Sequence, residues 1–284
     1  MAEPEFQSRA WRRFRRSRSA WIGGLLVGLC MFGALAADLL APYGPTDRGA
    51  KTFLRPSAEH FLGTDSHEYD VFTRTLYGAR LSLLASVVSV GIAITIGGFS
   101  GAVAGYFGGW TDSLILRSID ILLAFPGILI ALLVVVALEP SWTAVILAVG
   151  VLNVPVFCRQ VRATVLTVRD LDYVTACRAL GATPGYTLRR AILPSLVNPI
   201  IVLATLGLGT AILEVAGLSF LGIAGQPDEP EWGNMLAEAK NHLATTFYPA
   251  LAPGVAISLA VLGFNLLGDG LRDALDPRLH GRDE

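Results

Sequence analysis

The chain has 284 residues, of which 53% are hydrophobic and 16% are charged, and its formal net charge is −1. Soluble domains carry about 25% charged residues, so this composition excludes an ordinary soluble domain and indicates lipid as the solvent. The three cysteines (30, 158 and 177) show no paired spacing. We expect them to be small hydrophobic residues rather than disulfides or metal ligands.

Six stretches of the chain contain no Asp, Glu, Lys or Arg: residues 19–37, 81–111, 121–138, 140–158, 191–213 and 243–268. A helix needs about 17–25 residues to cross a bilayer, and each stretch is of that order. We therefore predict an all-α integral membrane protein with six transmembrane helices. The first stretch follows a basic segment, as a secretory signal does, but it exceeds the about 7–15 apolar residues of a signal core, so we expect it to be retained.

The basic residues predict the orientation of the chain, because cytoplasmic loops are enriched in Lys and Arg. The N-terminal tail, the 107–120 loop, the 159–190 loop and the C-terminal tail hold sixteen arginines, whereas the opposite loops hold five basic residues. Both termini are therefore predicted to be cytoplasmic. We interpret the N-terminal arginines as an orientation signal rather than as a nucleic-acid patch, so no nucleic-acid partner is expected.

This orientation gives a predicted domain organisation. It consists of a basic cytoplasmic tail (1–19), a first transmembrane helix (20–40), an extracytoplasmic loop (41–77), a core with transmembrane helices two to six (78–270) and a cytoplasmic tail (271–284). Within the core, residues 159–194 form a cytoplasmic loop and residues 222–246 an external loop.

The two external loops are rich in Pro and Gly, which predicts irregular structure with short amphipathic helices at the outer surface. The first loop contains five oxygen and nitrogen donors close in sequence: His60, Asp65, His67, Glu68 and Asp70. A metal site is one interpretation of these donors. However, no two of them hold the spacing of a known metal loop, so we predict neither a metal nor a cofactor.

Charged residues are rare inside the predicted spans, and such residues usually face a cavity or a partner. Glu214 lies about 30 Å along a helix from Pro194, which predicts a position near the outer face. It either lines the mouth of a pathway or is a helix-end carboxylate bonded to a neighbouring span, and we favour the second interpretation. Asp120 is expected to pair with Arg117 across one helical turn.

Asparagines and prolines also interrupt the apolar stretches. Asn153, Asn198 and Asn265 can form hydrogen bonds between helices, and Asn153 and Asn265 are, with Glu214, candidates for lining a pathway. Pro126, Pro155 and Pro199 are predicted to mark kinks.

The segment DYVTACRALGATPGYTLRRAILP, residues 172–194, is polar and lies between two apolar stretches. Leu171, Val174, Cys177 and Gly181 recur at a helical spacing, and residues 183–185 (Thr-Pro-Gly) then interrupt the helix before a second helical stretch. One helix face can thus pack on the bundle and leave residues such as Asp172 and Arg178 to meet a partner. A solvated connector at the lipid headgroups is an equal alternative.

This segment resembles the EAA loop of ABC-transporter permeases, in which Glu-Ala-Ala is followed by three residues, Gly, nine residues, Ile, one residue and Leu-Pro. Ala176 and Gly181 match this pattern, and Leu193 and Pro194 lie at the required distance. The chain departs from it at three positions: Thr175 replaces Glu, Cys177 replaces Ala and Ala191 replaces Ile. HFLGTD, DVFTRTLYGARLSL, GLSFLG, EWGNML and FNLLGDGLRDALDPRL extend the resemblance, in order, to permeases of dipeptide, oligopeptide and nickel importers.

The resemblance implies a type I ABC importer permease in the inner membrane of a prokaryote, with half of a translocation pathway and a coupling helix that docks on a cytoplasmic ATPase. It implies as partners a second permease, one or two ATPases and an extracytoplasmic solute-binding protein. The implied coupling residues are Asp172, Thr175, Ala176, Cys177, Arg178, Gly181, Leu193 and Pro194. The chain itself is not expected to be an enzyme, because neither of its lysines, Lys51 and Lys240, follows the Gly that a phosphate-binding Gly-Lys-Ser/Thr loop requires.

Two other functions compete with an importer subunit. An ion-coupled secondary transporter would show inverted repeats and ionisable groups near the middle of the membrane, and we find no convincing repeat. A membrane enzyme would need His, Ser or acid groups that converge in the spans, yet all four histidines (60, 67, 242 and 280) lie outside them. Peptide is the expected substrate, with nickel and glutathione as alternatives.

Overall fold

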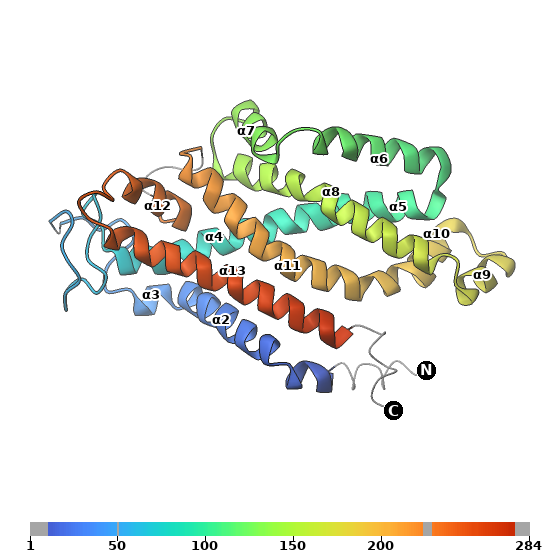
Figure 1. Ribbon diagram of the computed structural model, residues 1–284, viewed down its shortest axis with the longest axis horizontal. Coiled ribbons are helices and arrows are strands. Elements are labelled where there is room, and N and C mark those ends of the chain that lie inside the picture. The colour runs from blue at the N-terminus through green and yellow to red at the C-terminus, as the bar shows by residue number, and fades with distance from the viewer. Residues whose placement is uncertain (1–10, 50, 224–228, 276–284) are drawn as a thin grey trace.

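The computed structural model describes residues 11–49, 51–223 and 229–275. Over these residues it is a bundle of long helices without a strand, which confirms an all-α protein (Figure 1). Parts of the N-terminal tail, of the second external loop and of the C-terminal tail, with Arg278 and His280, lie outside the described residues.

Five helical segments are long and apolar enough to cross a membrane. They are α2 (Arg18–Leu35), α4 to α5 (Val71–Phe107), α8 (Trp142–Val168), α10 to α11 (Pro184–Phe220) and α13 (Tyr248–Leu275). A bent pair, α6 (Gly109–Leu123) and α7 (Gly127–Ala137), supplies a sixth span if it counts as one. The six predicted spans are found if this bent pair is counted as one span.

The third span differs from its prediction. The uncharged stretch 121–138 is not one helix, because α6 and α7 meet at an angle of 91°. Pro126 lies at the break and caps α7, since a proline cannot donate the hydrogen bond that would continue α6. The expected 107–120 loop is likewise mostly helical, and only a turn at Gly108, with φ of 65°, separates α5 from α6.

The second span begins before its uncharged stretch and contains an irregular turn. Asp70 caps α4 (Val71–Ala93) by accepting a hydrogen bond of 2.7 Å from the Thr73 amide. The π-helical turn η1 (Ile94–Gly98) then joins α4 to α5 (Phe99–Phe107). At Gly97 a Cβ would lie 2.5 Å from the Val154 carbonyl oxygen, so glycine allows α8 to approach this turn closely.

The two ends of the bundle differ in structure. Figure 1 places the start of α2, the end of α13 and the hairpin of α9 (Asp172–Ala179) and α10 (Pro184–Thr187) at one end. The loop between α3 (Ala37–Leu40) and α4, together with α12 (Trp232–Lys240), lies at the opposite end. Trp232 anchors α12, because its side chain is buried and its Nε1 donates to the Thr75 carbonyl at 2.9 Å. A short helix was expected in this loop.

Candidate functional site

The backbone of the 172–194 segment forms a closed turn around Gly181. The Gly181 amide donates to the Arg178 carbonyl and the Ala182 amide donates to the Cys177 carbonyl, at 3.0 and 3.1 Å. These two bonds form a Schellman motif, whose turn residue has a left-handed conformation, and Gly181 has φ of 83°. No atom lies within 4 Å of a Cβ built at Gly181. Gly181 is therefore required for the reversal of the chain, and its outer side is open.

A second helix follows this turn directly. Thr183 caps α10 by accepting from the Tyr186 amide at 3.4 Å, and Pro184 occupies its first turn. The helix continues through η2 (Leu188–Ile192) into α11 (Leu193–Phe220), so the second helical stretch is confirmed. Leu193 and Pro194 are exposed at the start of α11.

Three contacts attach α9 to the bundle. Val174 is fully buried in a cluster with residues of α8 and α11, including Val165 and Leu196. The Arg178 guanidinium lies 5.2 Å from the centre of the Tyr106 ring, at the end of α5. The Tyr173 and Ser195 hydroxyls are 3.1 Å apart. The sequence did not point to Tyr106 or Ser195, because these contacts depend on how distant segments pack.

The outer face of the hairpin is exposed. Leu180, beside the turn, is 88% exposed and Tyr186 is 57% exposed. The predicted apolar face is only partly buried: Val174 is buried and Cys177 half-buried, but Leu171 and Gly181 are exposed. The remaining predicted coupling residues, Asp172, Thr175, Ala176 and Arg178, are also exposed. The hairpin thus combines a fixed inner face with an outer face that carries apolar and charged groups.

The structure brings Asn153 and Glu214 together but leaves Asn265 elsewhere. The Asn153 side-chain amide donates to Glu214 Oε2 at 2.6 Å and to the Val149 carbonyl at 3.0 Å. Asn265 instead donates to the Val261 carbonyl, against Gly209. Glu214 is thus bonded to a neighbouring span, as expected.

Glu214 was expected near the outer face, but its partner Asn153 places it near the middle of the bundle. Asn153 lies near the middle of α8 (Trp142–Val168). Gly150 of α8 packs on Ile92 of α4, and Gly97 of η1 packs on the Val154 carbonyl of α8. Asn153 lies between these two positions of α8, so it is level with the centre of the uncharged 81–111 stretch. The estimate took Pro194 as the point where the helix enters the membrane, but Pro194 lies inside the continuous helical segment Pro184–Phe220 and does not mark that point.

Two carboxylates of α6 pair with arginines of α8. Asp120 accepts from Arg159 at 2.6 Å, so the expected pair with Arg117 is wrong. Asp112 accepts from two nitrogens of Arg162 at 2.5 and 2.6 Å. Pairs between helices replace the local pair, because the turn at Gly108 folds α6 back beside α5 and α8.

A buried charge cluster lies at the opposite end of the bundle. The fully buried Arg74 lies 3.1 Å from an Asp65 carboxylate oxygen and 3.6 Å from a Glu238 oxygen, and its guanidinium stacks on Tyr69. Burial raises the pKa of the Glu238 carboxyl; Asp65 adds to this effect, whereas Arg74 and His67 oppose it.

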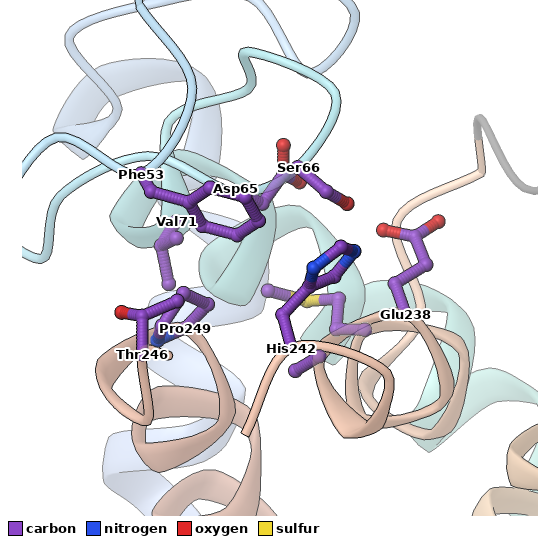
Figure 2. A pocket seen from close by; sticks show the side chains of 10 residues that line it. Phe53, Asp65, Ser66, Val71, Glu238, His242, Thr246 and Pro249 are labelled. Carbon is purple, nitrogen blue, oxygen red and sulfur yellow. The ribbon is translucent and has the colours of Figure 1, made fainter. Parts of the chain in front are cut away.

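Figure 2 shows a small cavity beside this cluster, where Asp65 and Phe53 of the first loop face Glu238 and His242 of the second. Four of the five donors in the first loop contact other side chains: His60 contacts Asp70 at 3.0 Å, Asp65 contacts Arg74 at 3.1 Å and His67 contacts Glu238 at 3.6 Å. In the described part of the chain no three His, Cys, Asp or Glu side chains form a group that could hold a metal ion.

The chain is similar to known proteins over nearly its whole length. Residues 78–281 match the family described as binding-protein-dependent transport system inner membrane component. Residues 6–56 match the N-terminal TM domain of oligopeptide transport permease C. The chain is 43% identical over 271 residues to the dipeptide transport system permease protein DppC of Alkalihalophilus pseudofirmus, covering 95% of this chain and 89% of that protein. It is 44% identical over 271 residues to the glutathione transport system permease protein GsiD of Pectobacterium atrosepticum, covering 95% and 90%.

Proposed function

Because the chain belongs to the family of binding-protein-dependent transport system inner membrane components, we propose that it is the permease subunit of an ATP-driven importer of short peptides. Two observations support this function: the family match over 78–281 and relatives named for dipeptide and glutathione transport. In this proposal the chain forms half of the pathway and a second, similar permease forms the other half. A solute-binding protein outside the membrane delivers the substrate.

We further propose that the α9–α10 hairpin is the coupling surface for a cytoplasmic ATPase. Its contacts with α5, α8 and α11 support this role, because a displacement of α9 would be passed to three spans at once. Its exposed Leu180 and Tyr186 offer apolar surface to a partner. Thr175 is exposed on the same helix, so the position usually occupied by Glu can contact the partner through a hydroxyl.

The coupling proposal is tested by changing the turn residue. We expect Gly181→Leu to leave membrane insertion intact and to abolish ATP hydrolysis stimulated by the binding protein. A left-handed conformation costs a residue with a Cβ about 1–2 kcal/mol, and the Leu side chain would occupy the open docking side. Gly181→Asn is the matched control, because Asn tolerates this conformation, and it should retain much of the activity. Normal coupling in Gly181→Leu would contradict the assignment.

Copurification and ligand titration test the remaining parts of the proposal. Recovery of a stoichiometric ATPase supports an importer subunit, whereas transport by the lone chain driven by a proton or sodium gradient would overturn it. Glutathione is the second candidate substrate, because several relatives are named for it. Titration of the partner binding protein with dipeptides and with glutathione distinguishes the two.

A further inference from the structure

Glu214 is the one charged residue in the 191–220 segment, and its carboxylate lies near the middle of the bundle. An ionisable group at this depth is costly, and such groups usually serve a pathway or a partner. The two carboxylates of α6 differ from it. Asp112 and Asp120 each pair with an arginine of α8, whereas the side-chain partner of Glu214 is the neutral amide of Asn153.

The surroundings of Glu214 indicate an open side. Its side chain is half-buried, and Thr210, one turn away on α11, is exposed. Gly217, the next position along this face, has no neighbour within 4 Å of a Cβ. The face therefore presents a hydroxyl, a carboxylate and a glycine at membrane depth. Such a surface suits water or a polar ligand better than lipid.

Asn153 fixes the position of the carboxylate. Its amide group has two N–H donors, of which one serves Glu214 and one the Val149 carbonyl of its own helix. Glu214 Oε2 is thus held against α8, while the remaining acceptor capacity of the carboxylate is available. A carboxylate held in this way is suited to accept hydrogen bonds from an ammonium group.

We propose that Glu214, oriented by Asn153, binds the amino-terminal ammonium group of a peptide midway along the translocation pathway. This inference rests on the proposed function, because it places this face of α11 on the pathway. The chemistry recognised is a primary ammonium group rather than the peptide side chains. A mid-membrane site of this kind would admit peptides of different sequence that share a free amino terminus.

Thiol labelling in the assembled complex tests the proposal without requiring the substrate. Thr210→Cys is introduced into a chain whose native cysteines are changed to alanine, and it is treated with cationic and anionic methanethiosulfonate reagents. Thr210 lies within about 5–6 Å of Glu214 between Cβ atoms, since the two are four residues apart on a helix. We expect the cationic reagent to react at least about tenfold faster, because a nearby charge in a medium of low dielectric attracts cations strongly.

Three variants make the outcome decisive. Adding Glu214→Gln should bring the ratio of the two rates close to one, whereas Glu214→Asp should preserve the preference. Leu25→Cys on α2, where Leu25 is 74% exposed, serves as a lipid-facing control that reacts with neither reagent. Equal rates in the presence of Glu214, or a Thr210→Cys chain as unreactive as the control, would overturn the proposal. The latter result would mean that lipid or the second permease covers this face.

Uptake by the same complexes separates this inference from the proposed function. If Thr210→Cys shows the cationic preference but the wild-type complex does not import peptide on ATP hydrolysis, the importer function fails while the cation site stands. If wild type imports peptide, Glu214→Gln should reduce its uptake at least about tenfold while the binding protein still stimulates ATP hydrolysis, because the lost charge acts on substrate alone. Unchanged uptake in Glu214→Gln would contradict the ammonium site but not the importer function.

Discussion

Two arginines of α4 differ in how deeply they and their ion-pair partners are buried. Arg74 has no exposed surface, and it lies against two carboxylates and a tyrosine ring. Arg80, six residues along the same helix, also pairs with a carboxylate, but its side chain is 38% exposed and that of Asp38 is 70% exposed. The two arginines therefore offer a direct comparison of a buried and an exposed ion pair.

We expect Arg74→Met to lower the free energy of unfolding by about 3–5 kcal/mol, because it leaves Asp65 and Glu238 without their cation in a buried site. Arg80→Met should lower it less, because water screens the exposed pair with Asp38 and the other losses are hydrogen bonds to the Ala34 and Leu35 carbonyls. Thermal unfolding of the purified protein in detergent measures both. Equal shifts of the unfolding temperature for the two variants would show that the cluster of Asp65, Arg74 and Glu238 does not stabilise this end of the bundle.

Whole helices were easier to predict than their interruptions. Uncharged length identified the regions of α2, α8, α11 and α13, because only helices of that length satisfy their backbone in lipid. It did not identify the break between α6 and α7, since a proline can either kink a helix or end it. The sequence suggested a local partner for Asp120, and the structure supplies one on another helix. Pairing of that kind depends on packing, which sequence spacing does not encode.

The contact between α2 and α13 depends on small residues. A Cβ at Gly23 would lie 2.4 Å from the Leu267 amide nitrogen, whereas one at Gly24 meets nothing within 4 Å. We expect Gly23→Ala to destabilise the protein by about 1–3 kcal/mol, because the helices must move apart. Gly24→Ala should be neutral or stabilising by up to about 1 kcal/mol, because alanine favours a helix.

Thermal unfolding and limited proteolysis in detergent, applied to both glycine variants, measure this difference. The proteolysis shows whether α2 separates from α13 before the rest of the bundle unfolds. A Gly23→Ala protein as stable as Gly24→Ala would mean that this contact adapts without cost.

The complete molecule has two unlike ends, and their assignment to the two sides of the membrane remains a prediction from the arginine count. We expect a membrane-impermeant thiol reagent to label Ala58→Cys, in the exposed first loop, in intact cells with a permeable outer layer. Gly185→Cys, in the hairpin, should be labelled only after the inner membrane is opened. Both changes are made in the cysteine-free background. The reverse pattern would invert the topology and remove the hairpin from the cytoplasm.

The two candidate sites were predictable to different extents. The hairpin was predictable because its turn is local: Gly181 and the residues that close it lie within a few positions. Glu214 was recognisable as unusual from its charge, but its depth and its partner Asn153 depend on two helices that are distant in sequence. For the Arg74 cluster the sequence singled out Asp65 alone, as a possible metal donor, since Asp65 and Glu238 lie far apart in the chain.

The broken span also constrains how the protein is made. With 15 and 11 residues, α6 and α7 extend about 22 and 16 Å, less than the about 30 Å of hydrocarbon that a helix must cross. Moreover, Asp112 and Asp120 of α6 find their arginines only on α8, which leaves the ribosome later. We therefore expect the third span to insert stably only when α8 is present, because the two helices neutralise each other's charges.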